Sequence, residues 1–184
     1  MKLTILVDDK TVYSLNAVMG KKSDKEECMM AEKYSALDVA KYIVNYAIND
    51  LKLPITNLKL QKILYFIQLD FLDEMGDTLF TNDIEAWKYG PVVSRTYSHY
   101  RKYSDLPITD TFLPRTTFSR SEDLIIKRVV REYIRINEWE LVKITHEEGP
   151  WKEVYVEGEN RIISENLLRD FAEERRASAF NYIT

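Results

Sequence analysis

The fold is decided by residues 57–76, which read NLKLQKILYFIQLDFLDEMG. Apolar side chains recur three or four residues apart here, which is the spacing of one face of an α-helix. Further apolar residues extend this surface around the cylinder, so we expect a helix that is packed on several sides and lies at the centre of the domain. Asn57 can cap its first turn, and Gly76 can supply the left-handed residue after its last turn.

The next informative stretch is IEAWKYGPVV, residues 84–93, which we expect to begin with a short strand. Proline disfavours a helical backbone at the residue before it, and glycine accepts nearly any backbone conformation. Gly90 and Pro91 therefore predict a sharp bend. Proline also suits the first position of a helix, so we expect Pro91 to open one that runs through Tyr97 towards Tyr103.

The aromatic residues of this bend have two interpretations. Trp87 and Tyr89 stand on alternate positions, beside Gly90, Pro91 and Val93. Aromatic side chains on a rigid turn can bind a partner with little loss of entropy. They can equally form a packed structural corner, which the residues alone favour because most large aromatic side chains are buried.

A third group of residues, His146 and Glu147 beside Pro150 and Trp151, invites a catalytic or metal-binding interpretation. A zinc protease helix needs two histidines four residues apart, and the other histidine of this chain, His99, is distant in sequence. We therefore favour a histidine at a helix end that is hydrogen-bonded to backbone or carboxylate, with Trp151 as a core anchor. No catalytic residue, metal or cofactor is expected.

These three motifs together resemble the Panacea domain family of SocA-like antitoxins and GepA-type phage-associated proteins. The resemblance rests on LKLQKILYF at 58–66, EAWKYGPV at 85–92, and Thr145-His146-Glu147 followed by Pro150-Trp151. It extends from about residue 36 to about residue 171. It implies a helical antitoxin domain that neutralises a partner toxin and that is associated with a phage or mobile element.

Composition sets the class of protein. The chain has 184 residues, of which 45% are hydrophobic and 30% charged, as in ordinary globular domains. A net charge of −4 makes nucleic acid an unlikely partner for the chain as a whole. The single cysteine, Cys28, cannot form an internal disulfide, and no apolar run reaches membrane-spanning length. We expect a cytoplasmic protein that does not enter a membrane.

The expected fold is mainly α with minor β, a compact bundle of about six helices around residues 57–75. Residues 1–34 are expected to form an N-terminal β-hairpin arm with a polar connector, and residues 35–184 the Panacea-like helical domain. Other expected helices are residues 36–51, a helix capped by Ser119 with Glu122, one capped by Asn137 with Glu140, and one capped by Ser164.

Two groups of basic residues could contact phosphates or an acidic partner. The first comprises Lys127, Arg128, Arg131 and Arg135 on one predicted helix, where a solvated face is the favoured interpretation. The second comprises Arg95, Arg101 and Lys102, interleaved with Tyr97, Tyr100 and Tyr103. These tyrosines could stack nucleobases, but they could equally pack on a neighbouring helix.

The resemblance thus implies a non-catalytic antitoxin that binds a cognate toxin directly. The alternatives are an adaptor that delivers the toxin to a protease and a DNA-binding phage regulator, while a hydrolase would need His146. The residues expected to bind the partner or to carry the motif are Trp87, Tyr89, Gly90, Pro91, Val93, Tyr97, Tyr100, His146, Glu147, Pro150 and Trp151.

Overall fold

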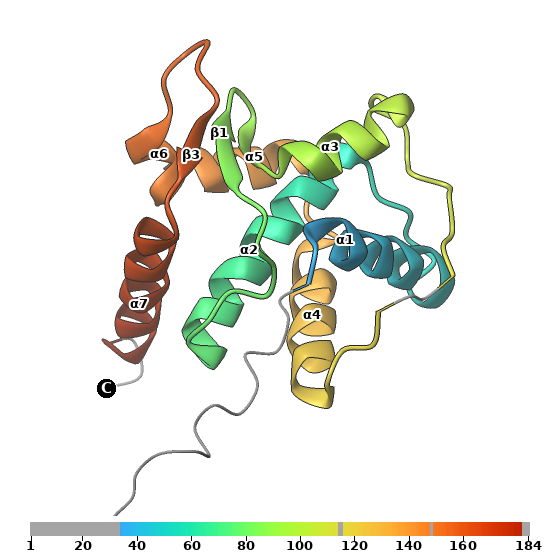
Figure 1. The fold of residues 1–184 in the computed structure, drawn as a ribbon, viewed down its shortest axis with the longest axis horizontal. Coiled ribbons are helices and arrows are strands. Elements are labelled where there is room, and N and C mark those ends of the chain that lie inside the picture. The colour runs from blue at the N-terminus through green and yellow to red at the C-terminus, as the bar shows by residue number, and fades with distance from the viewer. Residues whose placement is uncertain (1–33, 114–115, 148, 182–184) are drawn as a thin grey trace, which may run out of the picture. The chain divides into compact units, whose positions relative to one another are not determined.

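A computed structural model describes residues 34–113, 116–147 and 149–181 of the chain (Figure 1). The predicted hairpin arm therefore lies outside the described residues. The described part is mainly helical, as predicted. Its α-helices are α1 (Ala36–Asn45), α2 (Asn57–Met75), α3 (Ser94–Tyr100), α4 (Arg120–Tyr133), α5 (Glu138–Glu147), α6 (Pro150–Val154) and α7 (Glu165–Asn181). A π-helical turn, η1 (Tyr46–Asp50), follows α1, and a 3-10 turn, η2 (Arg101–Tyr103), follows α3.

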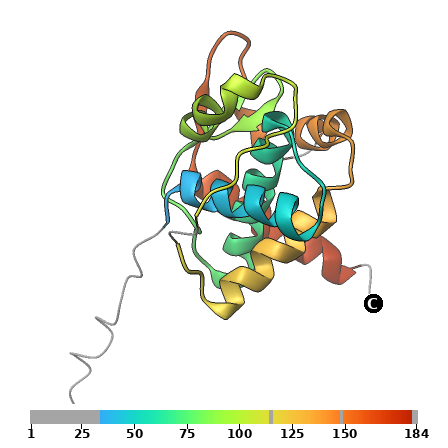
Figure 2. The ribbon, with the colours of Figure 1, turned by 90° about the vertical axis from the view of Figure 1, so that its right-hand side faces the viewer.

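The central helix α2 is buried on all sides over most of its length, which confirms the prediction. It contacts α1, α3, α4, α5, α7 and strand β2 (Gly90–Val92). In Figure 1 it lies between α7 and α4, and Figure 2 shows α1 crossing it on another side. Such a helix cannot keep a single polar face, so its polar residues must find partners inside the protein.

The first turn of α2 is capped by Thr56, so the prediction that Asn57 caps it is wrong. The Thr56 hydroxyl accepts a hydrogen bond from the Lys59 backbone N–H at 3.2 Å, and Thr56 has the extended backbone of a cap residue. Asn57 is already helical, and its buried side chain donates to the Tyr97 carbonyl at 3.0 Å. Gly76 has φ of 70° after the last turn, which confirms its predicted role.

The stretch after α2 forms a three-stranded antiparallel sheet with the order β2-β1-β3. Strand β1 (Ile84–Trp87) was expected, whereas β2 and β3 (Arg161–Ile163) were not. Pro91 lies in β2 opposite Ala86, so the prediction that it opens a helix is wrong. An edge strand tolerates proline because one row of its backbone groups has no partner strand, and α3 begins three residues later.

Polar side chains of α2 hold the strand β2 and helix α3 in place. The Gln61 side-chain oxygen accepts from the Val93 backbone N–H at 3.0 Å, and its NH₂ donates to Asn57 at 3.0 Å. Asn57 in turn reaches the Tyr97 carbonyl. This buried chain of hydrogen bonds fixes the entry into α3 relative to the central helix.

The other predicted helix starts are confirmed in position, although the expected part of Glu140 in the cap of α5 is not seen among the described residues. Ser119 and Glu122 form a complete capping box at α4. The Asn137 side chain accepts from the Trp139 backbone N–H at 2.9 Å before α5, and Ser164 accepts from the third residue after it, at the start of α7. Among the described residues, no helix is long and apolar enough to cross a membrane.

Candidate functional site

The three sequence motifs meet at one corner, where α2, the β1–β2 turn and α5 come together. The Lys62 ammonium donates to the Pro91 carbonyl at 3.0 Å. Gly90 has φ of 98°, and a Cβ atom there would lie 2.6 Å from Lys62 Nζ and 2.7 Å from Thr145 Oγ1. Glycine is therefore required for its backbone conformation and also for the space that the lysine and threonine occupy.

Lys62 is the residue at this corner that no motif interpretation anticipates. Its side chain is fully buried, and among the described residues no carboxylate pairs with it. Burial lowers the pKa of Lys62 to about 7, because a charged amine is poorly solvated in the core. One signal in the sequence could have indicated that Lys62 is buried. It lies between core residues of a helix that is apolar on all sides.

Trp151 connects α6 to the end of β1 by a hydrogen bond. Its indole N–H donates to the Trp87 carbonyl at 2.8 Å, and its side chain is buried, so the predicted core anchor is confirmed. The Trp87 indole donates in turn to the Glu85 carboxylate at 2.7 Å, and its ring meets Tyr97 edge-on at 5.0 Å. Pro150, also buried, stands at the first position of α6.

His146 lies in the last turn of α5, as predicted, but its ring makes a different contact. It stacks on Trp151 with 3.7 Å between ring centroids and an interplanar angle of 4°. Its Nε2 is buried and has no hydrogen-bond partner among the described residues, contrary to the prediction. Burial, and secondarily the nearby Lys62 charge, lower the pKa of His146, so the ring is neutral at physiological pH.

A metal or catalytic role at His146 receives no support from its surroundings. Glu147 is exposed and pairs with Lys143 at 3.8 Å on the same helix. His99 packs against Tyr100 and Phe112, not against His146. In the described parts of the chain, no three His, Cys, Asp or Glu side chains gather as metal ligands would.

The predicted site residues divide into a buried scaffold and an exposed surface. Gly90, Pro91, Val93, Tyr100, Pro150 and Trp151 are buried, Trp87 and His146 are partly buried, and Tyr89, Tyr97 and Glu147 are exposed. Burial also raises the pKa of Tyr100, whose hydroxyl has no partner within the described residues. Most of the motif is therefore packed inside the protein, as the structural interpretation predicts. The exposed aromatic residues, Tyr89 and Tyr97, could still contact a partner.

Trp139 joins this exposed surface without belonging to any of the motifs. It lies in the first turn of α5, is 60% exposed, and meets the Tyr89 ring edge-on at 5.5 Å. Tyr89 itself is 48% exposed at the tip of the two-residue turn between β1 and β2. Only the fold brings these two rings together, because they come from separate segments.

The basic row on α4 is largely engaged within the protein. Lys127 pairs with Asp123 at 2.9 Å, Arg128 pairs with Asp70 at 3.0 Å and also with Glu74, and Arg131 donates to the Tyr46 hydroxyl at 3.2 Å. These contacts favour the predicted solvated face over a phosphate-binding row.

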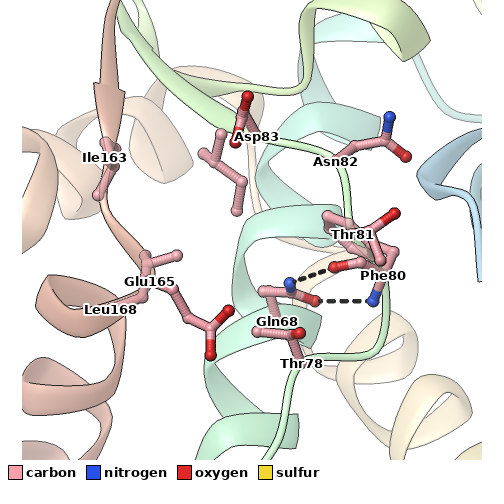
Figure 3. A pocket seen from close by; sticks show the side chains of 10 residues that line it. Gln68, Thr78, Phe80, Thr81, Asn82, Asp83, Ile163, Glu165 and Leu168 are labelled. Atoms are coloured by element: carbon pink, nitrogen blue, oxygen red, sulfur yellow. Dashed lines mark hydrogen bonds between the residues drawn. The ribbon is translucent and has the colours of Figure 1, made fainter. Parts of the chain in front are cut away.

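A separate pocket of about 160 Å³ lies beside α2, between the 78–84 loop, β3 and the start of α7 (Figure 3). At its floor the Gln68 amide donates to the Phe80 carbonyl at 2.9 Å and accepts from the Leu79 and Phe80 backbone N–H groups. Both ends of this side chain are thus used to hold the loop. Glu165 at the rim pairs with Arg169.

Comparisons with known proteins identify a family for this chain. A family model described as "Antitoxin SocA-like, Panacea domain" matches residues 60–152, which include the whole corner and Trp139. The protein named "Antitoxin SocA" from Caulobacter vibrioides (strain NA1000 / CB15N) is 33% identical over 113 residues, which cover 55% of this chain and 60% of that relative. No solved structure matches the chain. The chain therefore belongs to the SocA-like antitoxin family with a Panacea domain.

Proposed function

We propose that this protein is a non-catalytic antitoxin that neutralises a cognate toxin by direct protein–protein binding. The observation that carries the proposal is the family match over residues 60–152, together with a relative named as an antitoxin. Masking a toxin requires a complementary surface and no chemistry of its own. A neutral His146 stacked on Trp151 fits a structural role.

The corner supports this proposal because it presents aromatic side chains on a rigid base. Lys62, Gly90 and Trp151 lie inside and fix the hairpin, while Tyr89 and Tyr97 face solvent. A surface that is already ordered loses little entropy on binding. We therefore assign partner binding to the exposed residues of the motif and positioning to the buried ones.

Growth rescue tests the proposed function. The product of the neighbouring reading frame is induced alone and then together with this protein. Toxicity alone and recovery together are the expected result. A toxic neighbour that this chain does not rescue, or a harmless one, would contradict the proposal.

The abundance of the toxin in the rescued cells distinguishes two ways of neutralising it. Masking by direct binding leaves the toxin level unchanged, and the two proteins co-purify. Delivery to a protease shortens the toxin half-life when this protein is present. We expect masking, and a shortened half-life would replace it with the adaptor function.

A further inference from the structure

The pocket beside α2 shown in Figure 3 is a cavity that the proposed function does not use. Its volume is about 160 Å³. Sites for cofactors and drug-sized ligands are larger, roughly 300–1,000 Å³, so such a molecule does not fit. At about 30 Å³ for each water molecule, the space equals that of about five waters. A pocket of this size suits one long side chain of another protein.

The walls of the pocket are apolar and already ordered. Ile84 of β1 and Ile163 of β3 are paired across the sheet, and both are buried together with Leu168 of α7. On the other side, the Gln68 amide holds the backbone of residues 79 and 80 by three hydrogen bonds. The walls are therefore in place before a side chain enters, and a preformed site of this kind loses little entropy on binding.

The rim of the pocket is acidic. Asp83 is exposed where the loop enters β1, and among the described residues its carboxylate has no hydrogen-bond or ion-pair partner. Glu165 extends from the start of α7 towards Gln68, as Figure 3 shows. One of its carboxylate oxygens accepts from Arg169 at 2.8 Å, which leaves the other without a partner in the described part of the chain. The rim therefore offers carboxylate oxygens to a cation.

The segments that surround the pocket carry an excess of negative charge. Residues 76–84 and 161–170 form most of the pocket, and they hold four acidic and two basic side chains, namely Asp77, Asp83, Glu165, Asp170, Arg161 and Arg169. Both arginines are already paired with carboxylates, Arg161 with Glu159 at 2.7 Å and Arg169 with Glu165. A cleft lined by charges of one sign attracts a group of the opposite sign, which here is a cation.

We infer that this pocket receives one lysine or arginine side chain of the toxin. The inference rests on the proposed function and names the chemistry of one contact. The aliphatic part of that side chain packs on the apolar walls, and its charged end pairs with Asp83 at the rim. Glu165 adds to the negative potential that draws the cation in. A protein that presents an acidic side chain at this position is rejected, because like charges then meet.

A side chain of a protein is a better occupant than a free cation. An ion pair at an exposed carboxylate contributes about 1 kcal/mol or less, so a free amine gains little from Asp83. A side chain of the toxin enters together with the rest of an interface, which supplies the remaining affinity. Calcium and magnesium ions prefer about six or more oxygen ligands. In the parts of the chain that the structure describes, no three acidic, histidine or cysteine side chains gather around such an ion's position.

Affinity measurements with the purified toxin from the rescue experiment test the inference. The rim variants are Asp83→Asn, Asp83→Lys and Glu165→Gln. Their matched controls are Asp105→Asn, Asp105→Lys and Glu173→Gln, which make the same charge changes at exposed carboxylates outside the pocket. Spermidine serves as the free-amine probe. A set of toxin variants, each with one lysine or arginine replaced by glutamate, identifies the side chain that enters.

Asp83→Asn is expected to weaken toxin binding about tenfold and Asp83→Lys at least about a hundredfold, with unchanged thermal unfolding. Glu165→Gln should weaken binding about threefold, while the controls bind as the wild type does. One toxin variant should bind the wild type weakly and bind Asp83→Lys at least about tenfold more tightly, because the exchanged charges pair again.

Two outcomes separate this inference from the proposed function. If the wild type rescues growth but the rim variants bind like their controls, the pocket is refuted as a contact and the antitoxin function stands. If the wild type does not rescue growth, both fall. Micromolar binding of spermidine that is lost in Asp83→Asn, with toxin affinity unaffected, would also overturn the inference, because the pocket would then take a free amine.

Discussion

The ammonium of Lys62 lies 3.0 Å from the carbonyl oxygen of Pro91, inside the core and without a counter-ion among the described residues. This hydrogen bond joins the first motif, on the central helix α2, to the second, on strand β2. It places an amine with a pKa of about 7 beneath the turn that carries Tyr89. The Lys62 amine therefore connects two elements of the fold and also makes this corner sensitive to pH.

Stability should rise with pH above 7 because of Lys62. The ordinary pKa of lysine, 10.5, applies to the unfolded chain, so between about 7 and 10.5 the unfolded state binds a proton that the folded state has released. The free energy of unfolding is expected to increase by up to about 1.4 kcal/mol per pH unit from pH 7 to 9. Chemical denaturation across that range measures it.

Lys62→Met should remove most of this slope, because the variant has no amine to titrate. Lys152→Met, at an exposed lysine of α6, is the matched control and should keep the wild-type slope. A wild-type protein whose stability is flat from pH 7 to 9 would show that Lys62 titrates normally.

Gly90→Ala should destabilise the protein strongly, by about 2–4 kcal/mol, since the residue has positive φ and its Cβ would press on Lys62 and Thr145. Gly158→Ala is the matched control. Gly158 also has positive φ, 79°, but nothing lies within 4 Å of its added Cβ, so only the backbone strain of about 1 kcal/mol is expected. Urea unfolding compares the two variants. Equal losses would mean that the lysine and threonine move aside freely.

Trp151→Phe should lower stability by about 1–2 kcal/mol, because phenylalanine keeps much of the packing but loses the hydrogen bond to the Trp87 carbonyl. Trp139→Phe makes the same chemical change at an exposed site and should leave stability within about 0.5 kcal/mol. Thermal unfolding of both variants tests this difference. If Trp151→Phe is as stable as the wild type, the hydrogen bond from Trp151 to the Trp87 carbonyl does not stabilise the hairpin.

His146→Phe should retain growth rescue, because phenylalanine can keep the stack on Trp151 and needs no hydrogen-bond partner at the buried Nε2 position. The expected change in stability is small or favourable, since an unpaired buried polar atom is removed. Rescue and thermal unfolding are measured together. Lost rescue in a stably folded variant would point to a chemical role for the imidazole.

The elements that local patterns specify were predictable. The helical spacing in α2, the capping box of Ser119 and Glu122, the positive φ of Gly76 and the bend at Gly90 follow from interactions within a few residues. Such interactions leave a readable signal in the order of residue types. Local patterns fail where two local options compete, as with Pro91, which suits a helix start but lies in an edge strand.

Strand β3 and Trp139 show what sequence patterns cannot specify. Strand β3 is three residues long and forms because Ile163 meets Ile84 across the sheet. Trp139 becomes part of a surface because α5 places it against Tyr89. Neither contact is encoded by neighbours along the chain, since each depends on segments that are separated by at least fifty residues and brought together by packing.

The sequence by itself therefore determined a central buried helix, the rigid glycine–proline corner and, through three ordered motifs, the family. Tertiary structure alone decided which motif residues are scaffold and which are surface. It buried Lys62, Tyr100 and Trp151 and left Tyr89 exposed. The physical reason is that burial depends on which elements cover a residue, and that covering is set by long-range packing and not by the type of the residue or its neighbours.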